Sequence, residues 1–210
     1  SMSLGAPSDL LVQASDSVTV VVTYADIGGS GVNNASITLA IGDVSVVNDT
    51  GTASATVLSV TGSVSTRTIT LNSFTGNGTF HLNVLSNTGS DLAANPAPSA
   101  TSVTITVDTT IPTATLSSTT ALTPTQVANG PISVDLVFSE GVTGLTTGDF
   151  TVTNGSVTAV TPVSASAYTV TLTPSAGSNV VTIQTVAAAG NDGAGNASTV
   201  SNTLSFTVVV

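Results

Sequence analysis

The sequence predicts an all-β protein, and three observations carry this prediction. Apolar residues make up 40% of the 210 residues but aromatic residues only 3%, so the core has to be built from Val, Ile, Leu and Ala. Val and Thr recur throughout the chain, and their branched Cβ atoms favour strands. The 19 glycines and 8 prolines supply turns, and no long segment shows the apolar period of a helix.

Seven short runs of strand character follow one another in the second half of the chain. In the run 132–138, Val134, Leu136 and Phe138 share one face and Asp135 lies on the other. The other six runs are 113–117, 149–154, 156–162, 167–174, 179–186 and 202–208. Seven such strands in about a hundred residues are typical of an immunoglobulin-like sandwich of two antiparallel sheets.

The first half of the chain has a similar pattern. The run 17–24 places four apolar or aromatic side chains on one face, and 67–72, 79–85 and 101–107 are further predicted strands. The region 35–60 holds more strands, whose borders the sequence does not define.

The two halves also align with each other. The aligned pairs are Tyr24 with Phe138, Asp26 with Glu140, Asp91 with Asp192 and Asn95 with Asn196. The segment "VDTTIPT" interrupts the strand pattern, because Pro112 cannot donate a ladder hydrogen bond. We therefore predict two tandem immunoglobulin-like β-sandwich domains, at 5–108 and 109–210.

The phrases "FSEGVTGLTTGDFTVTNGSV" (138–157), "NDGAGN" (191–196) and "VDTTIP" (107–112) resemble the bacterial Ig-like repeats of large surface and secreted proteins. The resemblance is weaker in the first half, where Asp26 replaces a Glu and Ala94 replaces a Gly. It implies tandem arrays in adhesin-like stalks, often with calcium at the joints, and it implies no enzyme.

The charge balance limits the partners that the chain can bind. The chain has one basic residue, Arg67, and 11 acidic residues, for a net charge of −10. Nothing in it neutralises phosphates, so we expect no binding to nucleic acid, and no apolar run is long enough to insert into a membrane. The chain has no cysteine and therefore no disulfide. Its excess of acidic residues is compatible with the binding of divalent cations.

Three acidic residues fall where an immunoglobulin-like fold brings segments together at one pole. Glu140 follows the second predicted strand of its domain, Asp192 precedes the last one, and Asp108 lies in the linker that enters the first. Calcium prefers oxygen ligands, and backbone carbonyls, Asn191 or Asn196 and water would complete its shell. In the alternative interpretation, Asp192 hydrogen-bonds the backbone of its own turn, and Asp108 and Glu140 are solvated charges.

Three more acidic residues are candidates for metal binding. Asp149 opens a strand, where a role in capping the "TTGD" turn is an equal alternative. Asp26 and Asp91 are the counterparts of Glu140 and Asp192 in the first domain, and their linker carboxylate would lie upstream of the sequence given.

The sequence offers few combinations of residues that could form a catalytic site. His81 is the only histidine, which excludes the usual zinc ligand sets and disfavours a Ser-His-Asp triad. We therefore expect no enzyme. The sequence predicts a monomeric spacer or stalk module of an extracellular bacterial adhesin, flanked by neighbouring Ig-like repeats and with calcium at the interdomain joint. A module that binds a host protein or glycan through its loops or a sheet face is the alternative.

Overall fold

The computed structural model describes residues 1–118, 130–177 and 180–208. Its contacts divide the chain into two units, Ser1–Thr109 and Thr110–Val210. The division falls one residue beyond the predicted boundary at 108. In the described residues, no helix is long and apolar enough to cross a membrane.

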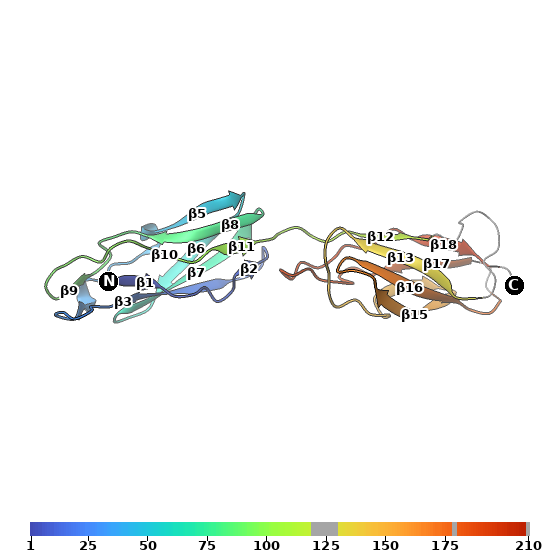
Figure 1. The fold of residues 1–210 in the computed structure, drawn as a ribbon, viewed down its shortest axis with the longest axis horizontal. Helices are drawn as coiled ribbons and strands as arrows, with labels where there is room; N and C mark the ends of the chain where they lie inside the picture. Colours follow the sequence, from blue (N-terminus) through green and yellow to red (C-terminus); the bar gives the residue numbers. More distant parts are fainter. Residues whose placement is uncertain (119–129, 178–179, 209–210) are drawn as a thin grey trace. The chain divides into compact units, whose positions relative to one another are not determined.

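The first unit contains two sheets and a short additional strand pair (Figure 1). One sheet is antiparallel and has the order β1 (Met2–Leu4), β3 (Val18–Tyr24), β7 (Thr66–Thr75) and β6 (Ser54–Thr61). In the other sheet, β8 (Gly78–Val84) pairs with β5 (Val44–Gly51) on one side and with β10 (Ala100–Thr101) and β11 (Ile105–Val107) on the other. The strand β2 (Leu11–Val12) then pairs with β11 in parallel.

The remaining elements of the first unit are short. Two 3₁₀ turns, Asn34–Ser36 and Ile41–Asp43, precede β5. The pair of β4 (Val32–Asn33) and β9 (Ser90–Asp91) joins two loops of the unit.

The second unit contains the seven predicted strands in two antiparallel sheets (Figure 1). One has the order β12 (Ala114–Ser117), β13 (Ile132–Phe138), β16 (Ala167–Pro174) and β15 (Gly155–Pro162). The other has the order β14 (Phe150–Thr153), β17 (Val180–Thr185) and β18 (Leu204–Thr207). Residue 179, the first of one predicted run, lies outside the described residues.

In each unit the alternating strands bury one face against the other sheet. Val134 and Leu136 of β13 pack in one cluster with Ile183 of β17 and Phe206 of β18, and all four are at most 3% exposed. Val20 of β3 lies in the corresponding cluster of the first unit with residues of β8 and β11. Both units are therefore sandwiches of the predicted immunoglobulin-like type.

The prediction of one continuous strand over 101–107 is wrong. The run 101–107 is divided into β10 and β11, with 102–104 outside both strands. The hydroxyl of Ser102 accepts a hydrogen bond from the Leu82 amide over 2.9 Å. The Ser102 hydroxyl thus replaces a ladder partner at the point where one extra residue shifts the register against β8.

Candidate metal site

Asp192 is held by hydrogen bonds from its own loop. Its Oδ1 atom accepts from the amides of Ala194 and Asn196 over 2.9 and 2.8 Å, and its Oδ2 atom accepts from Asn196 Nδ2 over 2.8 Å. Gly195 has φ +95°, which allows the chain to turn tightly between these residues. The side chain is buried, with 6% exposure, so its carboxylate is fixed in one orientation.

Glu140 and Asp108 come from other segments. Glu140 lies two residues after β13, and its Oε1 atom is buried. Asp108 follows β11 directly, and its amide donates to the carbonyl of Val12 over 2.9 Å. Regular strand pairing thus fixes the main chain just before both acidic residues.

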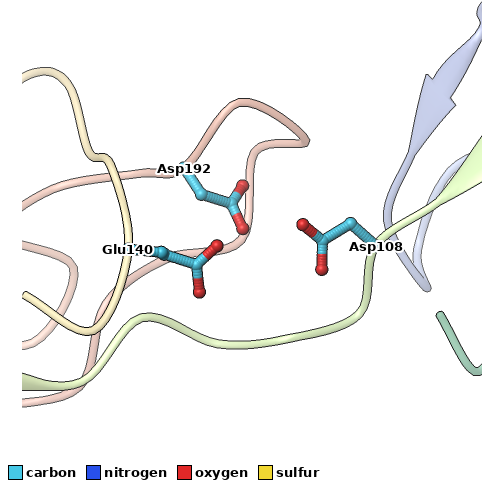
Figure 2. Close-up of side chains that lie close together, drawn as sticks. All are labelled: Asp108, Glu140 and Asp192. Atoms are coloured by element: carbon cyan, nitrogen blue, oxygen red, sulfur yellow. The ribbon is translucent and has the colours of Figure 1, made fainter. Parts of the chain in front are cut away.

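Figure 2 shows that the carboxylates of Asp108, Glu140 and Asp192 point toward one another. One oxygen from each residue lies within 4.8 Å of the oxygens from the other two. At separations below 5 Å, each pair of ionised carboxylates repels by about 3–4 kcal/mol if the effective dielectric constant is about 20. A cation between the three oxygens would convert this repulsion into attraction.

The donor set fits a hard divalent cation. All three side chains offer carboxylate oxygens, which are the ligands that calcium prefers. Asn191, named from the sequence as a further ligand, is exposed, and its carbonyl accepts from the Thr143 amide over 2.8 Å. The Nδ2 atom of Asn196 donates to Asp192, so this residue orients a candidate ligand.

The sequence of residues 108–208 matches the family described as bacterial Ig-like domain. The three carboxylates all lie within this span. The second unit is a bacterial Ig-like domain. Asp108 is the first residue of the matched span, two residues before the division between the units.

Among solved structures, the Escherichia coli adhesin FdeC is similar to this chain with 21% identity and a TM-score of 0.57. The alignment covers 100% of this chain and 64% of the FdeC chain, so this chain spans less than two thirds of it. The Yersinia pseudotuberculosis adhesin InvE is 19% identical over 100% of this chain and 58% of its own, with a TM-score of 0.34. At these identities the likeness to FdeC supports the Ig-like fold alone. No curated protein sequence matches the chain significantly.

Asp149 of the Ig-like domain lies outside the cluster of three carboxylates. Its Oδ2 atom accepts from the amide and the hydroxyl of Thr146, over 2.6 and 2.8 Å. These bonds close the turn that leads into β14. The structure therefore supports the capping role that the sequence left open for Asp149.

Asp26 and Asp91 lie together in the first unit, at a hollow that Tyr24 and Asn95 also line. Asp26 Oδ2 accepts from the Gly31 amide over 2.7 Å. Asn95 donates hydrogen bonds to Asp91 from its side-chain amide and from its backbone amide. The side-chain bond first, and the backbone bond second, lower the pKa of the Asp91 carboxyl below the usual 3.8. Within the described residues, no third ligating side chain joins this pair.

The two loops have matching hydrogen bonds. Asp91 and Asp192 each accept from the backbone and side-chain amides of an Asn four residues later, Asn95 and Asn196. These residues align between the two halves of the sequence, but the role of the Asn in positioning the Asp was not predicted. The sequence did contain a signal for this role, because an Asn follows the Asp by four residues in both halves.

The single histidine and the single arginine lie on strands of the first unit, β8 and β7. His81 Nδ1 lies 2.7 Å from Asp49 Oδ1, across the pair of β8 and β5. Arg67 lies in β7, between β3 and β6 in the sheet. Its guanidinium donates to the carbonyls of Val64 and Thr66 in the preceding turn.

Proposed function

We propose that this chain is a spacer segment in the stalk of an extracellular bacterial adhesin-like protein. We further propose that calcium, bound by Asp108, Glu140 and Asp192, ties the linker to the second Ig-like domain. The observation that supports the calcium site is the convergence of three carboxylates, one of them buried and held by its own loop. The spacer role is supported by the Ig-like fold, which the chain shares with the adhesin FdeC.

The position of Asp108 gives the ion its mechanical effect. The main chain of Asp108 is hydrogen-bonded to Val12 of the first unit, whereas Glu140 and Asp192 belong to the second domain. Domains joined by a short linker move relative to each other by default. A cation that binds all three carboxylates restricts the linker at Asp108 and stiffens the joint. Sites of this kind in extracellular modules have dissociation constants on the order of 10⁻⁴ to 10⁻³ M.

Calorimetric titration with calcium and thermal unfolding test this proposal. Glu140→Gln removes one ligand charge and keeps the shape of the side chain. Asp192→Ala is a poorer choice, because it also removes the acceptor for Ala194 and Asn196 and disturbs the loop. Asp135→Asn is the matched control, since it removes one charge from β13 of the same domain at a position outside the cluster.

We expect the effect of Glu140→Gln on the unfolding midpoint to have opposite signs with and without calcium. With a chelator, Glu140→Gln raises the unfolding midpoint of the second domain, because it removes repulsion among the carboxylates. With millimolar calcium it lowers the midpoint relative to the wild type, because a ligand that binds only the folded state stabilises it. The proposal is wrong if calcium leaves the wild-type midpoint unchanged, or if Asp135→Asn loses the calcium response equally.

A binding module is the second candidate, and two exposed apolar side chains favour it. Ile27 and Leu92 are 87% and 64% exposed, in the loops that carry Asp26 and Asp91. Single apolar residues also occur on surfaces that bind no partner, so a direct test is needed. The double variant Ile27→Ser and Leu92→Ser tests the binding role. If it loses binding to host cells while its unfolding midpoint is unchanged, the loops recognise a partner. If it binds host cells as the wild type does, the result favours the spacer role.

A further inference from the structure

The first unit has an element that the metal site does not explain, a two-residue strand that pairs with the last strand of the unit. In β2, Leu11 and Val12 lie opposite Thr106 and Val107 of β11, in parallel. The amide of Thr106 donates to the carbonyl of Leu10, and that of Asp108 to the carbonyl of Val12, both over 2.9 Å. The chain thus joins its N-terminal segment to the strand by which it leaves the unit.

Two acidic residues that the metal site leaves unexplained lie at the ends of this short strand. The Oδ1 atom of Asp9 accepts from the amides of Leu10 and Leu11, over 2.7 and 3.1 Å. The Oδ2 atom of Asp16 accepts from the amide of Gln13 over 2.9 Å. Both ends of β2 are therefore fixed by carboxylates, which explains how so short a strand keeps its register.

The pair is also anchored in the core of the first unit. Val12 is fully buried and Val107 is 1% exposed, and both belong to the same apolar cluster. If β2 slides along β11, it has to withdraw Val12 from this cluster as well as break hydrogen bonds. The side-chain packing and the backbone bonds therefore resist the same motion.

We propose that the pair of β2 and β11 is the force-bearing element of the first unit. This inference rests on the proposed spacer role, because a stalk carries tension between its two ends. Tension from the N-terminal side reaches β1 first and then β2, whereas tension from the C-terminal side reaches β11 through Asp108. Because β2 and β11 are parallel, these opposite pulls run along the strands and load the crossing hydrogen bonds together, in shear.

Single-molecule pulling on the whole chain, held by its two ends in the presence of a chelator, tests the proposal. Thr106→Pro removes the amide that donates to Leu10 and leaves the side facing β8 paired, because adjacent amides of a strand point to opposite sides. Thr38→Pro is the matched control. It also changes an exposed threonine and removes one backbone bond, that of the Thr38 amide to the Thr88 carbonyl over 3.0 Å, outside the loaded pair.

Both variants are expected to unfold at a lower denaturant concentration than the wild type. Only Thr106→Pro is expected to raise the unfolding rate of the first unit at constant force, by about fivefold or more for the loss of one net hydrogen bond. Equal effects of the two variants on the unfolding rate under force, or no effect of Thr106→Pro, would overturn the proposal. Because the measurement is made without calcium, a failure here is distinct from a failure of the calcium site, which the titration measures.

Discussion

The side-chain amide of Asn196 donates a hydrogen bond to Oδ2 of Asp192 over 2.8 Å, while its backbone amide donates to Oδ1 over the same distance. Both oxygens of the central carboxylate are therefore oriented by one residue that lies four positions later. The first unit repeats the arrangement with Asn95 and Asp91, at 2.8 and 2.7 Å. The loop that carries a candidate ligand is thus held by hydrogen bonds from its own residues.

We expect Asn196→Ala to weaken calcium binding by about tenfold, because groups that orient a ligand typically contribute that much to metal affinity. The variant also destabilises the second domain by about 2 kcal/mol, since it removes a buried hydrogen bond to a carboxylate. Calorimetric titration and denaturant unfolding measure the two effects.

Asn95→Ala is the control for Asn196→Ala, because it makes the same change in the first unit. It should leave calcium binding at Asp192 unaltered. If both variants weaken calcium binding equally, the orienting role of Asn196 is contradicted.

The carboxyl of Asp91 should titrate below 3.8, because hydrogen bonds from the Asn95 side chain and backbone stabilise its charged form. A group whose pKa is lower in the folded state stabilises the fold above its unfolded pKa, and this contribution is lost as the pH falls through the folded pKa. The loss therefore begins as the pH falls below about 4. Titration by nuclear magnetic resonance should show the pKa of Asp91 rising in Asn95→Ala, and an unchanged value would refute this account.

Asp149→Ala should destabilise the second domain by about 1 kcal/mol without changing its affinity for calcium. The substitution leaves the Thr146 amide and hydroxyl without the acceptor that closes their turn. Asp149→Asn retains an oxygen acceptor at the same place and should cost less. Loss of calcium binding in Asp149→Asn with unchanged stability would show instead that Asp149 is a ligand.

The strands with strict alternation were predicted with the fewest errors. The bounds of β13 and β16 coincide with the predicted runs 132–138 and 167–174, because a sandwich strand buries every second side chain. The run 101–107 has the same alternation, yet it breaks where the hydroxyl of Ser102 replaces a backbone partner. Residues 34–61 were not predictable in detail, since two 3₁₀ turns interrupt them and bulges shift the pairing of β5 and β6.

The candidate site was predictable to the extent that it depends on topology. Strand order alone brings the loop after β13 and the loop before β18 to one pole, which placed Glu140 and Asp192 together from the sequence. The orientation of each carboxylate depends on side-chain hydrogen bonds within a loop, and no period in the sequence records these. The sequence therefore named Asn196 only as a candidate ligand, and did not show that its side-chain amide donates to the candidate ligand Asp192.

Asn77 fixes the chain immediately after Asp108. The Oδ1 atom of Asn77 accepts from the Thr109 amide over 2.7 Å, and the Thr109 hydroxyl lies 3.0 Å from the same oxygen. Asn77→Ala should speed hydrogen exchange of the Thr109 amide and weaken calcium binding severalfold, because the linker then has to be ordered when the ion binds. Asn77→Asp keeps an acceptor oxygen and should protect the amide as the wild type does. Exchange that is equally slow in Asn77→Ala would show that the pairing of β2 with β11 holds the linker without this side chain.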